Sequence, residues 1–220
     1  MNNLILITSI INTPNKPLSY TNTRSVFSRK ERFEQTKLTI QSIKNKIPNN
    51  KILLVECSDF NEEEKLYFEK ECDYILNLWN NKELHSDIFG LSKALGEGTL
   101  TGQGFGYIKE NNICYNNLIK ISGRYWLNDK FDYDIFNNQS IIFRKSDGQS
   151  TSTVLYKIPN YIQDSLNTFL KDNYYNMKNC ISYEELFSKF LKSIKYNNTI
   201  LFDKLGVSGY VTVCGSFYEA

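Results

Sequence analysis

The stretch Leu118–Leu127, which reads Leu-Ile-Lys-Ile-Ser-Gly-Arg-Tyr-Trp-Leu, decides the expected fold. Apolar residues on both sides of Lys120 predict a buried strand, and Ser122 and Gly123 end it. Arg124 then stands where the chain leaves the sheet. Ligands of open α/β sheets bind beyond the carboxyl ends of the strands. A glycine that permits close backbone approach, followed by a planar guanidinium, therefore predicts a phosphate site at this strand end.

Lys120 is a second candidate for binding phosphate. It lies four residues before Arg124, and residues an even number apart on a regular strand face the same side of the sheet. The two cations are thus expected to meet one ligand, with Gly123 leaving room for it. The alternatives for Lys120 are a solvated position at the sheet edge and a salt bridge in the lining of the core.

Strands and helices alternate in the sequence before this stretch. Leu4–Ile11 and Lys51–Glu56 are apolar runs of the kind that form strands covered on both faces, and Tyr74–Leu78 predicts a third strand. Capping patterns at Ser28 and Asn61 predict the start of a helix after each of the first two strands. This alternation predicts an α/β fold with a Rossmann-like mixed, mainly parallel sheet flanked by helices.

Leu91–Asn111 has the apolar spacing of a helix with one buried face. Six of the eleven glycines nevertheless lie between Gly90 and Gly106, and each costs up to about 1 kcal/mol against alanine inside a helix. Glycine at this density either loosens the segment into a loop or allows its backbone to pack closely on a neighbour.

The C-terminal third is predicted from shorter patterns. A turn signal at Asp147-Gly148 joins two apolar runs and predicts a hairpin. Ser182 is a helix cap with Glu185 three residues later. The expected strands are Ser140–Arg144, Thr153–Lys157, Thr199–Phe202 and Tyr210–Cys214, and the expected helices are Asn160–Asp172 and Tyr183–Lys195.

The overall composition excludes several classes of protein. A net charge of +2 argues against a nucleic-acid-coating surface. Five cysteines without close pairs and a single histidine argue against a disulfide framework and a histidine-rich metal site, and suit a reducing cytosol. The apolar run after Met1 lacks the flanks of a signal peptide, and no stretch has the length of a membrane span. We expect a single globular, cytoplasmic domain.

Several short motifs follow one another along the first part of the chain. They are Arg24–Ser28, Glu31–Thr36, Ser42-Ile43, Ile47-Pro48, Leu54–Glu56, Lys93–Glu97 and Lys120–Tyr125. In this order and spacing they resemble small GT-A-like glycosyltransferases of bacterial surface-polysaccharide loci and of large DNA viruses. The resemblance covers residues 1–130 well and the remainder mainly through Leu205–Gly209.

The resemblance implies a GT-A-type Rossmann-like sheet and transfer of a sugar from a nucleoside-diphosphate-sugar donor to a glycan or lipid-linked saccharide acceptor. Residues 1–220 would form one domain, with a nucleotide-binding part at about 1–130 and an acceptor part at about 131–220. No nucleic acid is expected as a partner. The expected location is the cytoplasm, with a peripheral membrane position, or the host cytoplasm for a viral protein, as alternatives.

Two other functions stay open beside sugar transfer. A catalytically idle nucleotide-sugar binding module would share the fold. A sugar nucleotidyltransferase would share the sheet, but it would carry a glycine-rich, basic loop directly after the first strand. The corresponding loop here, Asn12–Thr23, has prolines and no glycine, which disfavours this second alternative.

The family resemblance also suggests which residues hold the donor. In GT-A folds the first strand and the loop after it contact the base and ribose, and basic residues lie near the phosphates. Carried over by position, the donor-binding candidates are Thr8, Ser9, Ile10, Arg24, Lys93, Lys120, Gly123 and Arg124.

Metal use stays open from the sequence. Many GT-A enzymes hold Mn²⁺ or Mg²⁺ with an Asp-X-Asp motif at a strand end where this chain has Ser122-Gly123-Arg124. Lysine and arginine can replace a metal in neutralising phosphate. A literal Asp-X-Asp motif follows at Asp132-Tyr133-Asp134. Asp132 and Asp134 are therefore the candidate metal ligands, with an acidic loop as the alternative.

An inverting transfer needs a base that takes the proton of the acceptor hydroxyl. Glu184, at the start of a predicted helix, resembles the acidic residues that GT-A enzymes place on the acceptor side. Its alternative role is to stabilise the helix dipole. Asp87 in a polar loop and Glu97 in the glycine-rich segment are the other catalytic candidates.

Overall fold

The structure is a computed structural model that describes residues 2–145, 151–194 and 198–220. Its strands are β1 (Asn3–Ser9), β2 (Asn50–Glu56), β3 (Tyr74–Asn77), β4 (Asn117–Ser122), β5 (Tyr125–Leu127), β6 (Ile141–Lys145), β7 (Thr151–Pro159), β8 (Thr199–Phe202), β9 (Val207–Tyr210) and β10 (Phe217–Glu219). Its α-helices are α1 (Arg29–Lys46), α2 (Glu62–Glu71), α3 (His85–Ile88), α4 (Lys93–Glu110), α5 (Tyr133–Phe136), α6 (Gln163–Asp172), α7 (Tyr174–Lys178) and α8 (Tyr183–Ser193), and 3₁₀ turns η1 (Lys82–Leu84) and η2 (Asn160–Ile162) precede α3 and α6.

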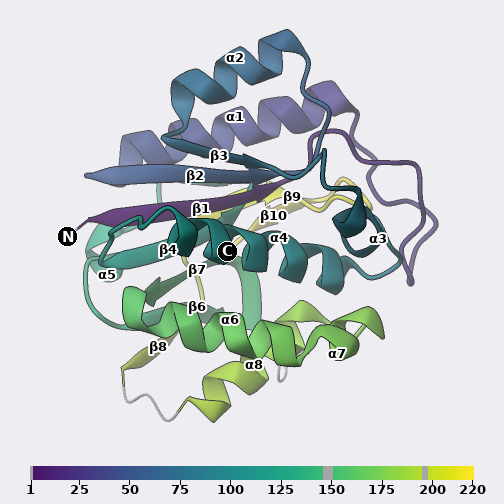
Figure 1. The fold of residues 1–220 in the computed structure, drawn as a ribbon. Helices are drawn as coiled ribbons and strands as arrows, with labels where there is room; N and C mark the ends of the chain where they lie inside the picture. The colour runs from purple at the N-terminus through teal and green to yellow at the C-terminus, as the bar shows by residue number, and fades with distance from the viewer. Residues whose placement is uncertain (1, 146–150, 195–197) are drawn as a thin grey trace.

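The main sheet has the strand order β3-β2-β1-β4-β7-β6-β8, and a smaller sheet has the order β10-β9-β5 (Figure 1). Strand β7 runs antiparallel to both of its neighbours, while the remaining pairs of the main sheet are parallel. The predicted α/β fold with a mixed, mainly parallel sheet is therefore confirmed.

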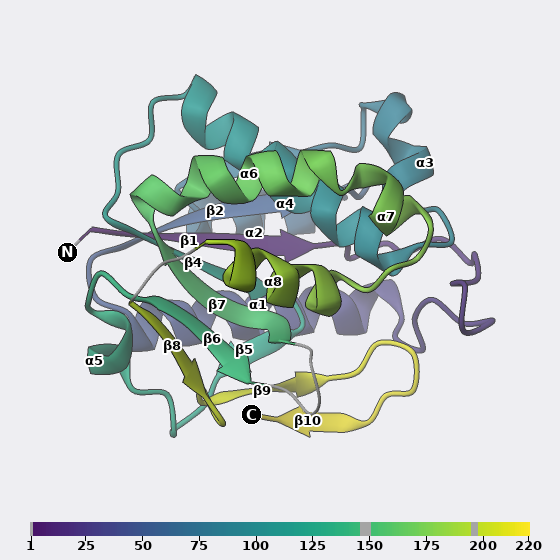
Figure 2. The same ribbon diagram turned by 90° about the horizontal axis from the view of Figure 1, so that it is seen from below.

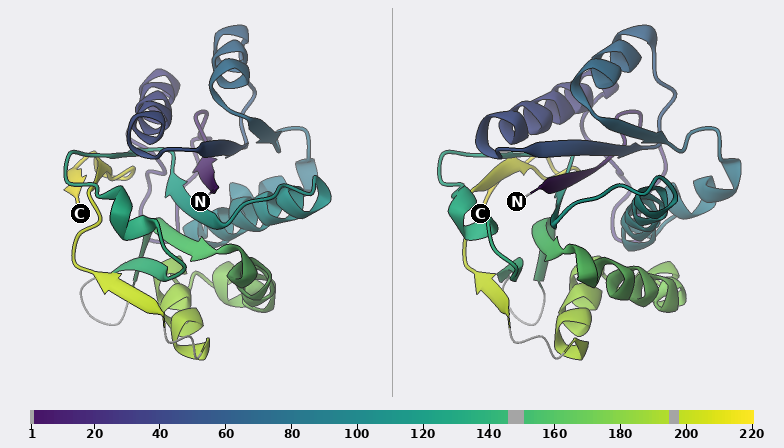
Figure 3. Two further views of the ribbon diagram at one scale, coloured as in Figure 1. Left: turned by 90° about the vertical axis from the view of Figure 1, so that its left-hand side faces the viewer. Right: turned by 60° about the vertical axis from the view of Figure 1, so that its left-hand side comes forward.

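Helices cover both faces of the main sheet. Helices α1 and α2 lie on one face, and α4, α6 and α8 lie on the other (Figures 1 and 3). Seen from below in Figure 2, the small sheet stands to one side of α8. Of the helices in the described residues, none combines the length and the apolar character that a membrane crossing requires.

Strand β1 explains why both layers hold to the sheet. Its residues alternate between the two faces. Leu4 and Leu6 join the core cluster under α4, α6 and α8, whereas Ile5 and Ile7 join the cluster under α1 and α2. The seven residues of the strand are all buried. Burial of apolar side chains on two faces at once is the pattern that a continuous apolar run predicts.

Helix α1 is fastened to the end of β4 by a stripe of hydroxyl groups. A capping box between Ser28 and Glu31 begins the helix as predicted. The Thr36 hydroxyl then donates to the Gly123 carbonyl at 2.9 Å, and the Thr39 hydroxyl donates to the Tyr125 carbonyl at 2.7 Å. These bonds to the backbone fix the helix against the turn that carries Arg124.

The glycines of α4 allow close packing and do not loosen the helix. A Cβ atom on Gly104 would lie 2.8 Å from Leu6 Cδ1 and 3.1 Å from Val55 Cγ2. A Cβ atom on Gly96 would lie 2.8 Å from the Ile88 carbonyl oxygen. The helix therefore comes closer to the sheet and to α3 than alanine would permit, and this brings its first turn to the strand ends.

One predicted strand is wrong. Tyr210–Cys214 was expected to be extended, but β9 ends at Tyr210 and the next residues form a turn in which the Val211 amide donates to the Ser216 carbonyl at 2.9 Å. The Thr212 carbonyl instead accepts from the Val26 amide at 2.9 Å. Strand pairing between β9, β5 and β10 thus ends sooner than the β-branched residues of this segment suggest.

The remaining C-terminal predictions agree with the structure. Strands β6 and β7 pair antiparallel as a hairpin would, and the turn expected at Asp147-Gly148 lies outside the described residues. Helix α8 begins after Ser182, whose hydroxyl accepts from the Glu185 amide at 3.1 Å.

Two neighbouring glycines of α4 test the packing argument. We expect Gly104→Ala to lower the free energy of unfolding by about 1–3 kcal/mol because the new methyl group meets Leu6 and Val55. Gly106→Ala is the matched control, since no atom lies within 4 Å of its Cβ position. That substitution should raise stability by about 0.5–1 kcal/mol through helix propensity. Urea denaturation of both variants measures the difference, and equal effects would contradict close packing at Gly104.

Candidate active site

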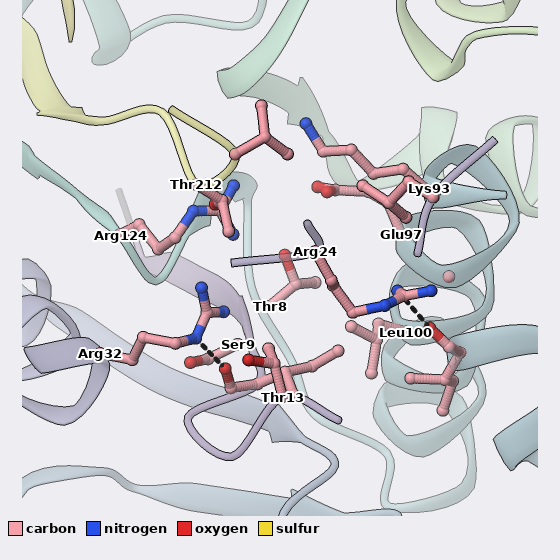
Figure 4. A pocket seen from close by; sticks show the side chains of 15 residues that line it. Thr8, Ser9, Thr13, Arg24, Arg32, Lys93, Glu97, Leu100, Arg124 and Thr212 are labelled. Carbon is pink, nitrogen blue, oxygen red and sulfur yellow. Dashed lines mark hydrogen bonds between the residues drawn. The ribbon is translucent and has the colours of Figure 1, made fainter. Parts of the chain in front are cut away.

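A cavity opens at the carboxyl ends of β1 and β4 (Figure 4). The end of β1, the first turns of α4, the turn after β4 and the loop between β9 and β10 form its walls. The lining residues are Thr8, Ser9, Ile10, Thr13, Leu18, Arg24, Arg32, Ile88, Lys93, Gly96, Glu97, Leu100, Arg124, Thr212 and Val213. This position is the one at which open α/β sheets bind their ligands.

Positive charge dominates the cavity. Three guanidinium groups and one ammonium group line it, against the single carboxylate of Glu97. Figure 4 shows Arg24, Arg32, Arg124 and Lys93 arranged around the same space. Like charges held this closely favour an anionic ligand, because an anion relieves their mutual repulsion.

Arg32 is the most deeply placed of these cations. It lies on the buried side of α1, and its Nε donates to the Ile10 carbonyl at 2.6 Å. Burial, and then the charge of Arg124, lower the pKa of Arg32 to about 9, although Glu56 acts in the opposite direction. A bound anion would therefore stabilise the charged form of Arg32.

Several polar atoms of the cavity have no partner within the described residues. They are the Nε atoms of Arg24 and Arg124 and the hydroxyls of Thr8 and Thr212. The guanidinium of Arg24 is anchored on its other side by the Gly90 carbonyl. Buried polar groups without partners are rare in folded proteins, so these atoms are available to hydrogen-bond to water or to a ligand in the cavity.

Gly123 shapes the cavity from behind and is not part of its lining. A Cβ atom at this position would lie 2.8 Å from Ser9 Cβ and 2.9 Å from Ser9 Oγ. The missing side chain therefore allows the turn after β4 to pack directly on the end of β1. This contact carries Arg124 to the cavity.

Lys120 does not face the cavity. It is fully buried and forms an ion pair with Glu97, and its Nζ also donates to Ser122 Oγ at 2.9 Å and to the Thr153 carbonyl at 3.0 Å. Its three protons are thus used within the protein. The salt bridge that the sequence left open for Lys120 is the arrangement found, and the side chain joins β4 to α4 beneath the cavity.

Glu97 is held in its ionised form by its neighbours. Burial acts to raise its pKa, but Lys120, Lys93 and Arg124 outweigh burial and leave the pKa of Glu97 below its ordinary value. Loss of contact with water, and then the charge of Arg124, lower the pKa of Lys93. The Glu97 carboxylate therefore balances part of the positive charge around it. Its lowered pKa makes it a weak base, which disfavours a role as proton acceptor.

A second cavity adjoins the first and shares Lys93 and Glu97 with it. Glu184 lines this second cavity, where its carboxylate accepts from the Thr153 hydroxyl at 3.3 Å. Tyr20, from the loop after β1, lines it too. Glu184, the candidate base predicted from the sequence, thus lines the adjoining cavity and not the cation-lined one.

Three further candidates lie away from both cavities. Asp87 is absent from the two linings and accepts from the Tyr174 hydroxyl at 3.0 Å. Asp132 and Asp134 are exposed at the start of α5, where Asp132 caps the helix. Between them, Tyr133 accepts from Asn3 at the amino end of β1, which is the opposite end of the sheet from the cavities (Figure 1). The metal role of these two aspartates stays a prediction, and the structure places them away from the cation-lined cavity.

Sequence reasoning therefore placed six of its eight donor-binding candidates in the cavity: Thr8, Ser9, Ile10, Arg24, Lys93 and Arg124. It missed Arg32. The available signal was the cluster of Arg24, Arg29 and Arg32, which places three of the five arginines within one stretch of nine residues. The remaining arginine of that group, Arg29, pairs with the buried Glu64 and does not line the cavity. No local sequence pattern identified Thr212. The pairing of β9 with β5 brings it to the cavity.

Comparisons with known proteins agree with the fold. No family model and no curated protein matches the chain. A crystal structure of a glycosyltransferase involved in the glycosylation of the major capsid of PBCV-1 matches with a TM-score of 0.50 and 10% identity, over 92% of this chain and 82% of that one. The glycosyltransferase GlyE of Streptococcus pneumoniae TIGR4 matches with a TM-score of 0.49 and 10% identity, over 92% of this chain and 45% of that one.

The ion pair beneath the cavity gives a prediction for stability. Lys120→Met should lower the free energy of unfolding by about 3–5 kcal/mol, because it leaves Glu97 largely buried and without its main partner. The double variant Lys120→Met/Glu97→Leu removes both charges and should recover most of that loss. Denaturation of the single and double variants measures the coupling. Additive losses would contradict a coupled pair.

At 10% identity, the structural similarity to the viral enzyme shows that the two proteins share a fold and shows nothing further. It confirms the expectation of a mixed α/β sheet with flanking helices, over nine tenths of this chain. The chain therefore has the fold of a GT-A-like glycosyltransferase, with a cation-lined cavity at its ligand-binding edge.

Proposed function

We propose that this protein is a glycosyltransferase that moves a sugar from a nucleoside-diphosphate-sugar donor to a glycan or glycoconjugate acceptor. The observation that carries the proposal is the cavity lined by Arg24, Arg32, Lys93 and Arg124 at the carboxyl ends of β1 and β4. A donor of this class brings two phosphates, which match a concentration of guanidinium groups.

The two ends of the donor meet different parts of the cavity in this proposal. Thr8, Ser9 and Ile10 at the end of β1 contact the base and ribose, next to apolar wall residues such as Leu100. The phosphates lie toward Arg124, where the Nε donors of Arg24 and Arg124 and two threonine hydroxyls have no partner among the described residues. Residues 1–130 supply most of this donor site, and residues 131–220 supply the acceptor side, with Thr212 and Val213 closing the donor wall.

Glu184 is the proposed base for transfer with inversion. The acceptor oxygen attacks the anomeric carbon, the bond from that carbon to the donor phosphate oxygen breaks, and the diphosphate leaves with the electron pair. Glu184 takes the proton of the acceptor hydroxyl. Its position in the adjoining cavity favours it over Glu97, which is paired with Lys120, and over Asp87, which lines neither cavity.

A donor screen tests the proposed function. A panel of nucleotide sugars should contain one class that raises the melting temperature, because a ligand at about 100 times its Kd stabilises by about 2.7 kcal/mol. The same class should release its nucleoside diphosphate slowly in the presence of water or a saccharide acceptor. Stabilisation without any release would indicate a binding module. Release of pyrophosphate from a nucleoside triphosphate and a sugar phosphate would indicate a nucleotidyltransferase.

Substitution of two adjacent glutamates, Glu184 and Glu185, can distinguish a catalytic role from stabilisation of helix α8. We expect Glu184→Gln to lower the rate of transfer by about 10²–10⁴-fold with little change in donor Kd. Glu185→Gln is the matched control, because Glu185 also lies in the first turn of α8 but pairs with Lys189 on the surface. Steady-state kinetics and donor titrations of both variants give the comparison. Equal rates in the two variants would rule out Glu184 as the base.

A further inference from the structure

The GT-A-like fold raises the question whether a divalent cation fits this cavity. The resemblance predicts carboxylates at the end of β4, where the structure has the turn Ser122-Gly123-Arg124. Mg²⁺ is held through one or two carboxylates together with the phosphates of the substrate. Of the described residues that line the cavity, Glu97 alone carries a carboxylate, and that group is engaged by Lys120.

Two further carboxylates near this edge of the sheet, those of Glu184 and Glu56, do not line the cation-rich cavity, and Glu184 belongs to the adjoining one. Glu56 is fully buried behind the wall, where its Oε1 accepts from the amides of Ile11 and Cys57 and from the Ser58 hydroxyl. It does not appear on the cavity surface. A divalent cation in this space would meet four protein cations and one compensated carboxylate, so Coulomb repulsion opposes its binding. The residues present therefore do not fit a metal site.

The same residues fit a diphosphate directly. We infer that Arg24, Arg124 and Lys93, with Arg32 beneath them, neutralise the diphosphate of the donor and of the leaving group, and that this site works without a divalent cation. The inference rests on the proposed function, since it assumes a diphosphate ligand. It goes beyond that function by assigning to protein side chains the charge that a metal supplies elsewhere.

The hydrogen-bond inventory of the cavity supports this assignment. The Nε donors of Arg24 and Arg124 are unused, and guanidinium groups bind phosphate oxygens in a bidentate manner. The hydroxyls of Thr8 and Thr212 are also free to donate. Lys93 is the first residue of the 18-residue helix α4, so the partial positive charge of a helix N-terminus acts in the same direction.

The count of charges supports it as well. The lining carries four cations against one carboxylate, and a nucleoside diphosphate brings about three negative charges. Because Lys120 already compensates Glu97, the four cations of the lining suffice to neutralise the diphosphate without an added ion. With a divalent cation also bound, the site would be left with excess positive charge at its most crowded point.

Calorimetric titration provides the test. The probes are four nucleoside diphosphates (UDP, GDP, ADP and CDP) and inorganic pyrophosphate, each titrated into metal-depleted protein with excess EDTA and again with MnCl₂. We expect the tightest-binding diphosphate to keep its Kd within about threefold between the two conditions. Arg24→Met and Arg124→Met should each weaken binding by about 10–100-fold, the range for a lost hydrogen bond to a charged group.

Matched variants exclude simple misfolding. Arg144→Met is the control, because Arg144 lies on β6 and binds the Tyr218 hydroxyl at 2.7 Å and the Asp203 carbonyl at 3.0 Å, outside the cavity. It should leave the Kd unchanged. Arg124→Lys keeps the charge but loses the fork, so its affinity should fall between those of wild type and Arg124→Met. Circular dichroism checks that each variant is folded.

The outcomes separate this inference from the proposed function. Binding that disappears with EDTA and returns with MnCl₂ would overturn metal independence and leave the proposed function intact. Metal-free binding that is unaffected by Arg24→Met and Arg124→Met would overturn the assignment to these arginines. Failure of every diphosphate and of pyrophosphate to bind in either condition would overturn the proposed function, and the inference with it.

Discussion

Mutual repulsion among clustered cations is the constraint on which this structure depends. Like charges close together in a partly buried site repel by several kcal/mol, and the fold must hold them there. It does so with neutral anchors: the Ile10 carbonyl for Arg32 and the Gly90 carbonyl for Arg24. The hydroxyl stripe of α1 fixes the turn that presents Arg124. The scaffold therefore holds four cations around one cavity, an arrangement that favours the anionic ligand of the proposed function.

The carboxylates of Glu97 and Glu184 have different surroundings, and this suits them to different roles in the proposed function. Glu97 is enclosed by cations, stays ionised and ties α4 to β4 through Lys120. Glu184 lines the adjoining cavity from a different helix, and its carboxylate accepts from the neutral Thr153 hydroxyl. An acid that neutralises a charge cluster is poorly suited to accept a proton, whereas one set at the edge of the cluster is available for it. In the proposed reaction, the boundary between the two cavities separates the charge-balancing Glu97 from Glu184, the proposed base.

The sequence predicted what local patterns determine. Continuous apolar runs identified the central strands, capping residues located α1, α2 and α8, and the strand-end argument correctly placed Arg124 at the cavity. The same argument misplaced Lys120, because it assumed a regular strand through Arg124, whereas β4 ends at Ser122. Residues brought in by distant strand pairing, such as Thr212, carry no local mark. The donor-binding roles, the base and the acceptor side are still predictions.

The loop between β9 and β10 has a consequence for the order of assembly. Its Thr212 and Val213 supply one wall of the cavity, and the Thr212 carbonyl is joined to the Val26 amide near the arginines. Synthesis proceeds from the N-terminus, and early segments begin to fold before later ones emerge. The cavity therefore lacks one wall until this late segment has docked against the N-terminal part of the chain.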